Sequence, residues 1–505
     1  MAMDSKNNVP CCLSQRWILS YISCWAFIMV YAIRINFSVA IVCMVDPTSN
    51  FNSTFYTSLN ENYTNSTESN VLINKNQGEF DWPKSVRSSL LAMYYYGYIL
   101  LQIPGGWVAT RFGGKRVLGL MTFITSILTL LTPVCARLHV NALYAIRFMI
   151  GFCAGVSFPA MHSMWGRWAP PLERSKLMGL SYSGPTIGVI LTYAVSGLLC
   201  VYGFDNGWGS IFYVTGIVGI LWSVTWYFMI HDTPQEHTRI TPAERRYIEN
   251  SIGSRPQLKV LKTPWVKMFT SSALWACLIS HVCNNWTNYT LQTSLPLFMR
   301  EVLEFDIKQN GFLSAVPYIC NIISANTSGH IIDYIRSKGY ISTGVARRSV
   351  QSISFVGQSV CLVAVGFMGK EQRHIAVVFL SLSMAFTGLN KGGYVINHVD
   401  FAPRFAGTLF GITNTFATIP GMVAPIVAGL LTPNRTVEEW RVVFYVCAGI
   451  GIFGAIFFAV FGKGEVQDWA RDPELEHEID VMRPLKIPDY NTDEETNIYR
   501  KKFKN

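Results

Sequence analysis

Long apolar runs, separated by short polar segments, occupy most of the chain. A helix that crosses a bilayer needs roughly 20 mostly apolar residues, and about twelve runs have this length. They lie near residues 17–45, 87–109, 117–136, 141–163, 177–200, 211–230, 270–298, 310–334, 349–368, 373–396, 405–431 and 442–462. Strands of a membrane β-barrel are shorter and alternate strictly, which these runs do not. The pattern predicts an all-α membrane protein with twelve transmembrane helices.

A polar segment at residues 231–269 separates six of the expected spans from the other six. We therefore expect an N-terminal segment (1–16), a six-helix bundle (17–230) with a long outer loop (46–86), a linker (231–269), a second six-helix bundle (270–462) and a tail (463–505). Within the linker, Thr241, Pro242 and Glu244 occupy the N-cap, first-residue and capping-box positions of a short helix.

The charge is unevenly distributed along the chain. Half of the residues are hydrophobic and only 14% are charged, which excludes an ordinary soluble domain. The formal net charge is +10, and basic residues gather in alternate loops: Arg111, Lys115 and Arg116; Arg167, Arg174 and Lys176; Arg336, Lys338, Arg347 and Arg348. Basic loops face the cytosol, so we expect these loops and both termini to be cytosolic. Membrane topology explains this charge without nucleic-acid binding.

Glycosylation sequons and cysteines extend this prediction. The sequons at Asn52, Asn62, Asn65 and Asn434 fall in loops on the expected outer side and are predicted to be glycosylated. Those at Asn36, Asn285, Asn288 and Asn326 fall within spans and should stay unmodified. The twelve cysteines are scattered through spans and termini, and the long outer loop has none, so no disulfide framework is expected.

Few ionisable residues lie within the spans, and those few are cations. Arg34 lies in YAIRINFSVAIV, Arg147 in YAIRFMIGFCAGVSF and Lys391 in TGLNKGGYVINHVD. No Asp or Glu lies at the same depth. A buried charge is costly, and a guanidinium suits a carboxylate or phosphate, so these residues are predicted to bind an anionic substrate shared between the two halves. Bonds to backbone carbonyls or snorkelling are the alternative interpretation.

Other polar and helix-breaking residues suggest a transport path. His162, His281 and His398 are candidate proton carriers, although neutral structural histidines would give the same pattern. Pro159, Pro185 and the segment with Pro420, Gly421 and Pro425 predict broken helices, and the YYYGY stretch at 94–98 either lines a cavity or packs. No enzyme, metal or cofactor motif is present, so neither an enzyme nor a cofactor is expected. A receptor or channel that binds the anion without carrying it is an alternative, but about twelve spans in two halves favour a carrier, since a seven-span receptor has no such division.

A loop motif recurs at matching places in the two halves. Its residues are Gly106, Arg111, Gly113, Lys115 and Arg116 after the second span, and Gly329, Asp333 and Arg336 after the eighth. This spacing resembles the gating loop of the major facilitator superfamily and implies its six-plus-six fold. The first copy has Thr110 where that motif has an acid.

Longer motifs carry a closer resemblance. GYILLQIPGGWVATRFGGK, FPAMHSMWGRWAPPLERSKL, NWTNYTLQTSLP, INHVDFAPRFAGTLFGITNTFATIPGMVAPI and GEVQDWA are similar to solute carrier family 17, from about Pro10 to Trp469. This family includes sialin, the vesicular glutamate transporters and the sodium–phosphate cotransporters. The resemblance implies an alternating-access anion carrier in which Arg34 and Arg147 face the central cavity and His162 belongs to the FPAMH motif.

The chain departs from the family at four further positions. Sialin-like members have two glutamates in the fourth span where this chain has Ile150 and Ala154, and the glutamate branch has an arginine at Asn284. Lys391 replaces a small polar residue. A sialin-like carrier of an organic anion such as an acidic sugar is therefore expected, with a sodium-coupled phosphate cotransporter or a potential-driven anion carrier as the alternatives.

Coupling and location are left open by these departures. The coupling ion is H+ or Na+. The termini lack an acidic dileucine pattern, which favours the plasma membrane over a lysosomal or vesicular one. We expect the carrier to function as a monomer in the lipid bilayer.

Overall fold

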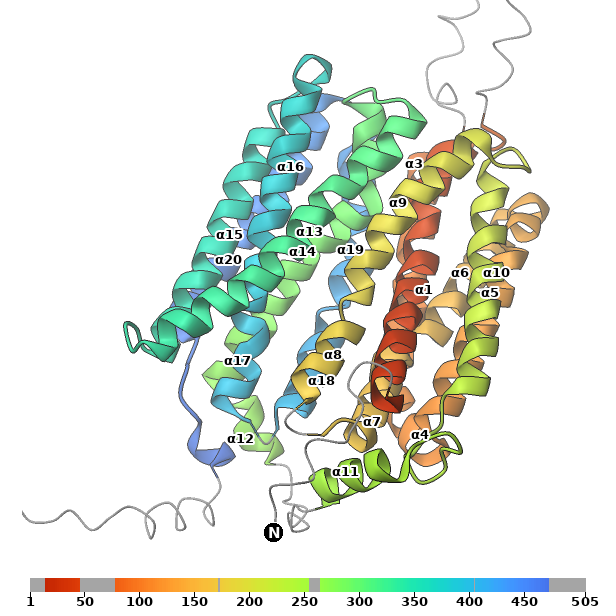
Figure 1. The fold of residues 1–505 in the computed structure, drawn as a ribbon. Coiled ribbons are helices and arrows are strands. Elements are labelled where there is room, and N and C mark those ends of the chain that lie inside the picture. Colours follow the sequence, from red (N-terminus) through yellow and green to blue (C-terminus); the bar gives the residue numbers. More distant parts are fainter. Residues whose placement is uncertain (1–13, 46–77, 171–172, 254–263, 404, 472–505) are drawn as a thin grey trace, which may run out of the picture.

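The computed structural model describes residues 14–45, 78–170, 173–253, 264–403 and 405–471 and is helical almost throughout. The helices of the first half form one bundle and those of the second half form another beside it (Figure 1). The expected sequons at Asn52, Asn62 and Asn65 lie outside the described residues. Asn434 is exposed between two helices of the second bundle.

The first bundle contains α1 (Gln15–Met44), α3 (Lys84–Leu100), α4 (Gln102–Phe112), α5 (Gly114–Leu138), α6 (Val140–Ala154), α7 (Ser157–Trp168), α8 (Arg174–Ser181), α9 (Gly184–Tyr202) and α10 (Trp208–Met229). The second contains α13 (Ser272–Glu301), α14 (Ile307–Ser337), α15 (Thr343–Val365), α16 (Arg373–Gly388), the 3-10 turn η4 (Leu389–Lys391), α17 (Tyr394–Phe401), α18 (Ala406–Phe416), α19 (Ile419–Leu431) and α20 (Val437–Phe461). Each expected span coincides with one helix or with consecutive helices.

Proline explains several of the broken spans. α6 gives way to α7 just before Pro159, α8 to α9 just before Pro185, and α18 to α19 just before Pro420. Proline lacks an N–H and disfavours helical geometry in the residue before it, so a helix tends to restart at that point. Pro425, by contrast, lies inside α19 without ending it.

Among the described residues, eight helical segments are long and apolar enough to cross a bilayer. The other four spans are α3–α4, α13, α14 and α15. α13 shows why a span can be less apolar than the other eight. Its polar residues Thr287, Gln292 and Thr293 are buried inside the molecule. A span that turns polar side chains toward the protein interior needs less overall hydrophobicity than one surrounded by lipid.

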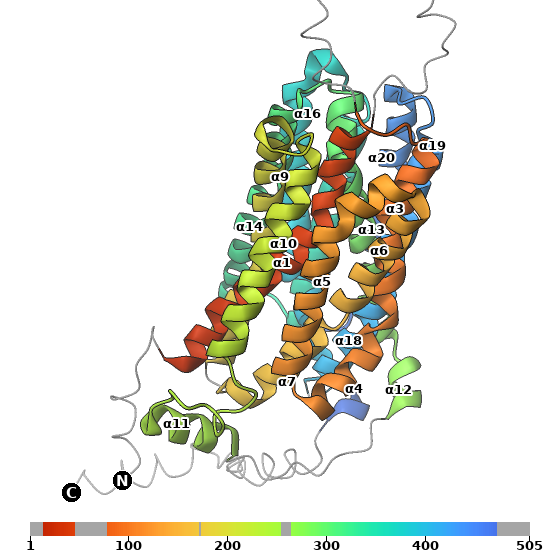
Figure 2. The same ribbon diagram turned by 90° about the vertical axis from the view of Figure 1, so that its right-hand side faces the viewer.

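The two ends of the molecule differ, as Figures 1 and 2 show. The short helices α11 (Pro242–Gly253) and α12 (Trp265–Phe269) lie at one end, here called the linker end. α11 begins at Pro242, and the Glu244 backbone N–H lies 3.3 Å from Thr241 Oγ1, as the capping pattern predicts. Arg16 joins this helix to α1 and α8 through Glu244, at 3.1 Å, and Glu173, at 2.6 Å.

Contacts between the bundles extend from the opposite end, the loop end, toward the middle. Lys84 pairs with Glu301 at 2.8 Å, and Arg300 Nη1 donates to the Val42 carbonyl at 2.6 Å. Gly197 of α9 faces Gly311 of α14, where an added Cβ would lie 2.7 Å from the opposite Cα. Deeper in the molecule, Gln102 Nε2 donates to Thr418 Oγ1 at 3.0 Å. The path between the bundles is therefore closed toward the loop end.

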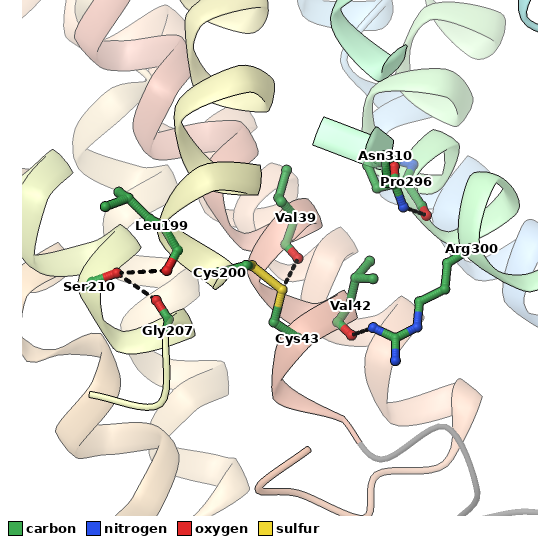
Figure 3. Close-up of a disulfide and its surroundings, with 10 residues drawn as sticks. All are labelled: Val39, Val42, Cys43, Leu199, Cys200, Gly207, Ser210, Pro296, Arg300 and Asn310. Atoms are coloured by element: carbon green, nitrogen blue, oxygen red, sulfur yellow. Dashed lines mark hydrogen bonds between the residues drawn. A yellow bond between two sulfur atoms is a disulfide. The ribbon is translucent and has the colours of Figure 1, made fainter. Parts of the chain in front are cut away.

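A disulfide joins Cys43, at the end of α1, to Cys200, near the end of α9 (Figure 3). The expectation of no disulfide is thus wrong. The two cysteines are 157 positions apart in sequence, yet α1 and α9 pack together and bring their Cα atoms within 6.3 Å. The spacing of the cysteines does not indicate this pairing, because it depends on which distant helices pack against each other in the folded protein.

Replacing both Cys43 and Cys200 with alanine should destabilise the loop end of the first bundle, because the disulfide restricts the unfolded chain. We expect a loss of about 2–4 kcal/mol in the free energy of unfolding. Thermal unfolding of the purified protein, with and without reductant, measures it. Cys135→Ala removes a free cysteine and serves as the control. Equal melting temperatures for wild type and the double variant would contradict the prediction.

Ion pairs centred on Arg137 also hold the loop end of the first bundle together. Arg137 Nε lies 2.7 Å from Glu79 Oε1, and Arg137 Nη2 lies 2.7 Å from Asp205 Oδ1. Asn206 and Trp208 also donate to Glu79, at 2.9 and 3.0 Å. The hydrogen bond from Arg137 is the largest influence on Glu79 and lowers its pKa, because it stabilises the carboxylate form.

The sign of this shift predicts how Glu79 contributes to stability at different pH values. A lowered folded-state pKa adds stability that is complete above the unfolded-state value, about 4.3, and is lost as pH falls through the folded-state value. Glu79→Gln should therefore lower the melting temperature at neutral pH, and its difference from wild type should shrink below about pH 4.3. A difference that stays constant down to pH 3 would refute this account. Glu249→Gln, at a partly exposed position of α11, is the control.

Candidate anion site

Arg34 is enclosed by aromatic rings in the middle of α1. Its side chain is 4% exposed. Its Cζ atom lies 4.5 to 5.9 Å from the ring centres of five tyrosines, here called the tyrosine cage: Tyr31, Tyr94, Tyr95, Tyr98 and Tyr289. Ring faces attract a guanidinium and offset part of the cost of its burial. The YYYGY stretch thus lines the space around the cation.

Close packing of α3 against α6 places the cage. Gly97 of α3 approaches the Phe148 carbonyl, and Gly151 of α6 approaches the Tyr94 carbonyl, so closely that a Cβ on either glycine would collide. Tyr289 comes from α13 in the second bundle, and its ring centre lies 4.7 Å from that of Tyr95. It was missed from the sequence, since no periodicity relates α13 to α3.

Arg147 lies beside the same Tyr94 ring. It is 1% exposed, and its Cζ atom lies 4.7 Å from the Phe37 ring centre and 5.4 Å from that of Tyr94. Arg34 lies 5.2 Å from the same Tyr94 ring. Both arginines belong to the first bundle, and the second bundle contributes Tyr289 to their surroundings.

These guanidinium groups have unmatched hydrogen-bond donors. Nε and Nη2 of Arg34 and Nε of Arg147 are buried without an acceptor, and no carboxylate pairs with either side chain among the described residues. A buried charge without a partner is expensive, whereas a charge-assisted hydrogen bond to an anion is strong. The arrangement is suited to an anion with at least two acceptor oxygens.

The fourth-span positions that lack the family glutamates are buried. Ile150 is packed in the core, and Ala154 lines a small internal pocket with Val30, Ile33 and the hydroxyl residues Thr122, Thr125 and Ser157. Neither residue can neutralise Arg147 or carry a proton. No carboxylate at these two positions therefore offsets the positive charge of Arg147.

Two of the predicted histidines meet in the second bundle. His281 Nδ1 of α13 lies 3.2 Å from Thr413 Oγ1 of α18, and His398 Nε2 of α17 lies 3.1 Å from the same oxygen. His398 Nδ1 lies 3.1 Å from the Val395 carbonyl, which can only accept, so Nδ1 carries a proton. In the neutral ring, Nε2 then accepts from the Thr413 hydroxyl, which itself accepts from His281. Thr413 was not predicted.

Lys391 and His162 lie apart from these groups. Lys391 is exposed in η4, between α16 and α17, and interacts electrostatically with His281. His162 is exposed on α7 of the first bundle, with its ring centre 5.2 Å from that of Tyr182. Neighbouring Asn390 is buried and donates to Asn284 at 2.6 Å, so neutral amides surround the break in span ten.

The first copy of the loop motif turns between α4 and α5. Gly113 has φ +93°, in the left-handed region that glycine tolerates. Asp232, which follows α10, accepts from the Lys115 backbone N–H at 2.7 Å. An acid from outside the motif therefore sits beside this turn. Gly106 and Arg116 lie nearby in sequence, and the exposed Arg111 stacks on Trp107 at 5.7 Å.

The second copy lies at the end of α14. Gly329 has no atom within 4 Å of an added Cβ, and Arg336 Nη2 donates to Thr343 at 2.9 Å. The side chains of Thr110 and Asp333 lie outside the described part of the structure. Whether the two copies act as gates stays a prediction.

The charge pattern placed Arg347 in a loop, and the structure shows that this prediction is wrong. Arg347 is buried within α15, which begins at Thr343 instead of the expected 349. Its Nε atom lies 2.7 Å from Asp400 Oδ2, and its Nη1 atom donates to the Gly392 carbonyl at 2.8 Å. This ion pair ties α15 to α17 at the linker end, and the sequence offered no signal for it.

Comparison with known proteins settles the family. Residues 22–425 match the model of the Major Facilitator Superfamily. The chain belongs to this superfamily. A bacterial homologue of the human lysosomal transporter Spinster has the same fold at 12% identity, with a TM-score of 0.65 over 90% of this chain and 98% of the other. A D-xylose–proton symporter gives a TM-score of 0.63 at 15% identity, over 88% and 100% of the two chains.

Curated relatives define a narrower group within the Major Facilitator Superfamily. Sialin of Ovis aries is 46% identical over 464 residues, which are 91% of this chain and 92% of the relative. Sialin of Homo sapiens is 44% identical over 93% of both chains. Vesicular glutamate transporter 2 of Bos taurus is 38% identical over 92% of this chain and 76% of its own. The resemblance to solute carrier family 17 is confirmed, and the protein is a membrane transporter, not an enzyme.

Proposed function

We propose that this transporter carries an organic anion with a carboxylate group and that Arg34 and Arg147 bind this group. The observation that supports the proposal is the set of buried guanidinium donors without acceptors. Both guanidinium groups lie close to the same Tyr94 ring, at 5.2 and 5.4 Å from its centre, which supports one anion bound by both while its remaining atoms contact the tyrosine cage. The cage supplies apolar faces and hydroxyl groups, which suit an organic molecule better than a bare inorganic ion.

The relatives support an organic substrate. Both sialins exceed 40% identity, and the vesicular transporters are named for glutamate. A sodium-coupled phosphate cotransporter is less well supported by these relatives. At the position of the arginine expected in the glutamate branch, Asn284 hydrogen-bonds to Asn390 and Tyr394 as a neutral amide. An acidic sugar therefore stands ahead of glutamate as the substrate.

The path between the two bundles is closed at one end of the molecule, as expected for one state of an alternating-access transporter. The loop end is closed by Lys84–Glu301 and by the contact of Gly197 with Gly311, while His162 and Lys391 in the linker-end half are exposed. Breaking the loop-end contacts would separate the bundles there and expose the tyrosine cage from the other side. Both bundles come from one chain, so a monomer suffices for the cycle.

Three features support a cytosolic linker end. Basic loops gather there, whereas the loop end carries the Cys43–Cys200 disulfide and the exposed sequon at Asn434. Disulfides form in oxidising compartments, which lie on the non-cytosolic side of a membrane. The sequence features that favour the plasma membrane over a lysosomal or vesicular membrane lie in the termini, outside the described residues.

The His281–Thr413–His398 chain supports a proton as the coupling ion. A second proton on His398 would convert Nε2 from acceptor to donor. The Thr413 hydroxyl could then donate to the Phe410 carbonyl, 3.1 Å away, and accept from His398. The chain can therefore take up a proton without losing a hydrogen bond, a function that Ile150 and Ala154 cannot supply. Lys391 and Tyr394 are the other ionisable groups facing His281.

Arg34→Gln and Arg147→Gln should each lower uptake of the carboxylate substrate. Losing charge-assisted hydrogen bonds worth 1.5–3 kcal/mol corresponds to a fall of roughly 10- to 100-fold in kcat/KM. Uptake of radiolabelled sialate, glutamate and phosphate into proteoliposomes tests this, with the proton gradient, the sodium gradient and the voltage imposed separately. Arg348→Gln, which removes an exposed arginine, is the matched control.

Unchanged uptake in both variants would disprove the role of the two arginines. Uptake of phosphate alone, driven by sodium, would instead establish the phosphate alternative. Binding of a labelled anion without accumulation in sealed vesicles would indicate a receptor rather than a carrier.

Thr413→Val should abolish proton-driven accumulation while leaving exchange of labelled for unlabelled substrate intact, because it breaks the link between the histidines but leaves the arginines in place. Uptake under a proton gradient and exchange without one are the two measurements. Thr415→Val alters a neighbouring exposed threonine that bonds the Gly411 carbonyl and should behave as wild type. Retained proton-driven accumulation in Thr413→Val would exclude the histidine chain.

A further inference from the structure

A second group of cations lies at the loop end, outside the tyrosine cage. Lys84 and Arg87 come from α3 in the first bundle, and Arg300 comes from α13 in the second. Arg435 precedes α20. These four residues, with Glu301, are called the loop-end basic cluster. Arg87 lies seven positions before Tyr94, about 10 Å nearer the loop end at 1.5 Å per residue.

One buried carboxylate, that of Glu301, pairs with two of the four cations. Glu301 Oε2 lies 2.8 Å from Lys84 Nζ and accepts from Trp440 Nε1 at 3.1 Å. Glu301 Oε1 lies 3.8 Å from Arg435 Nε. Arg300 Nη1 also donates to the Val42 carbonyl. Among the described residues, the carboxylate of Glu301 therefore pairs with Lys84 and Arg435 and not with Arg87.

Arg87 has the least compensation. It is 5% exposed, and both Nε and Nη2 are buried without an acceptor among the described residues. Arg300 and Arg435 repel it, while Glu301 and the exposed Asp81 attract it. Nε and Nη2 form one edge of the planar guanidinium, the edge that binds two oxygens of a carboxylate in parallel.

We propose that the loop-end basic cluster is a second anion site, which binds a carboxylate-type oxyanion on the Nε–Nη2 edge of Arg87. The ligand is either a free small oxyanion or the carboxylate of the transported substrate. Only the second of these rests on the proposed transport function. The existence of the site depends on Arg87 alone and is independent of Arg34.

The site would also stabilise the closed loop end. Its cations come from both bundles, so they repel one another across the interface that Lys84 and Glu301 hold together. An anion between them reduces this repulsion and favours the conformation seen here. Separation of the bundles at this end would split the site and release the anion.

The experiment measures the melting temperature of the purified protein as chloride is replaced by acetate at constant ionic strength. Acetate is expected to raise the melting temperature above that in chloride, for wild type and for Arg34→Gln. Arg87→Gln should lose this response, with at least a tenfold loss of apparent acetate affinity, since one charge-assisted bidentate contact disappears. Lys370→Gln removes an exposed cation from the same end and is the matched control.

A second variant separates charge from geometry. Arg87→Lys keeps the positive charge and is expected to remain folded, but its single ammonium cannot form the bidentate contact, so its acetate response should weaken by a similar factor. A response to the transported anion but not to acetate, lost in Arg87→Gln and kept in Arg34→Gln, would support the site and identify the substrate as its source.

Three results would overturn the proposal: an anion response retained in both Arg87 variants, an equal effect of chloride, acetate and the transported anion, or loss of the response in Arg34→Gln. The last result would locate the effect at the tyrosine cage. Loss of uptake in Arg34→Gln alone tests the proposed function separately.

Discussion

Burial of a guanidinium without a counter-ion is the constraint on which the rest of this structure depends. Arg34 and Arg147 lie in a low-dielectric interior, where an unpaired charge is costly. The protein compensates with ring faces instead of carboxylates, which leaves donors available. A carboxylate at the same place would form a strong internal ion pair, and a substrate anion would then have to displace it.

The two bundles contribute different chemistry to the path. The first supplies both cations and four of the cage tyrosines, and the second supplies Tyr289 and a neutral network around Asn284 and Asn390. The paired histidines lie in the second bundle, away from the arginines. In the proposed function this separation lets an anion and a proton occupy different bundles, so that movement of one bundle against the other can couple their fluxes. The ion pairs that hold the molecule together lie near its ends, for example Arg347–Asp400 and Lys84–Glu301.

Both the similarity of this chain to its relatives and its differences from them bear on the proposed mechanism. The chain shares a fold with distant transporters and close to half of its residues with the sialins. Ile150 and Ala154 nevertheless replace the acidic pair expected from the resemblance, and both side chains are buried. In the proposed mechanism the coupling group lies elsewhere, at the two histidines that Thr413 links.

The sequence alone determined the helical membrane fold, the division into two bundles and the cations within the spans. Apolar runs and isolated charges are local properties, and the bilayer acts on each span separately. Only the tertiary structure decided the partners of these residues. Tyr289 beside Arg34, Thr413 between the histidines, Asp400 beside Arg347 and Cys200 beside Cys43 are contacts between distant helices. Such contacts depend on how helices rotate and approach, which small residues such as Gly97 and Gly151 control and hydrophobic periodicity does not encode.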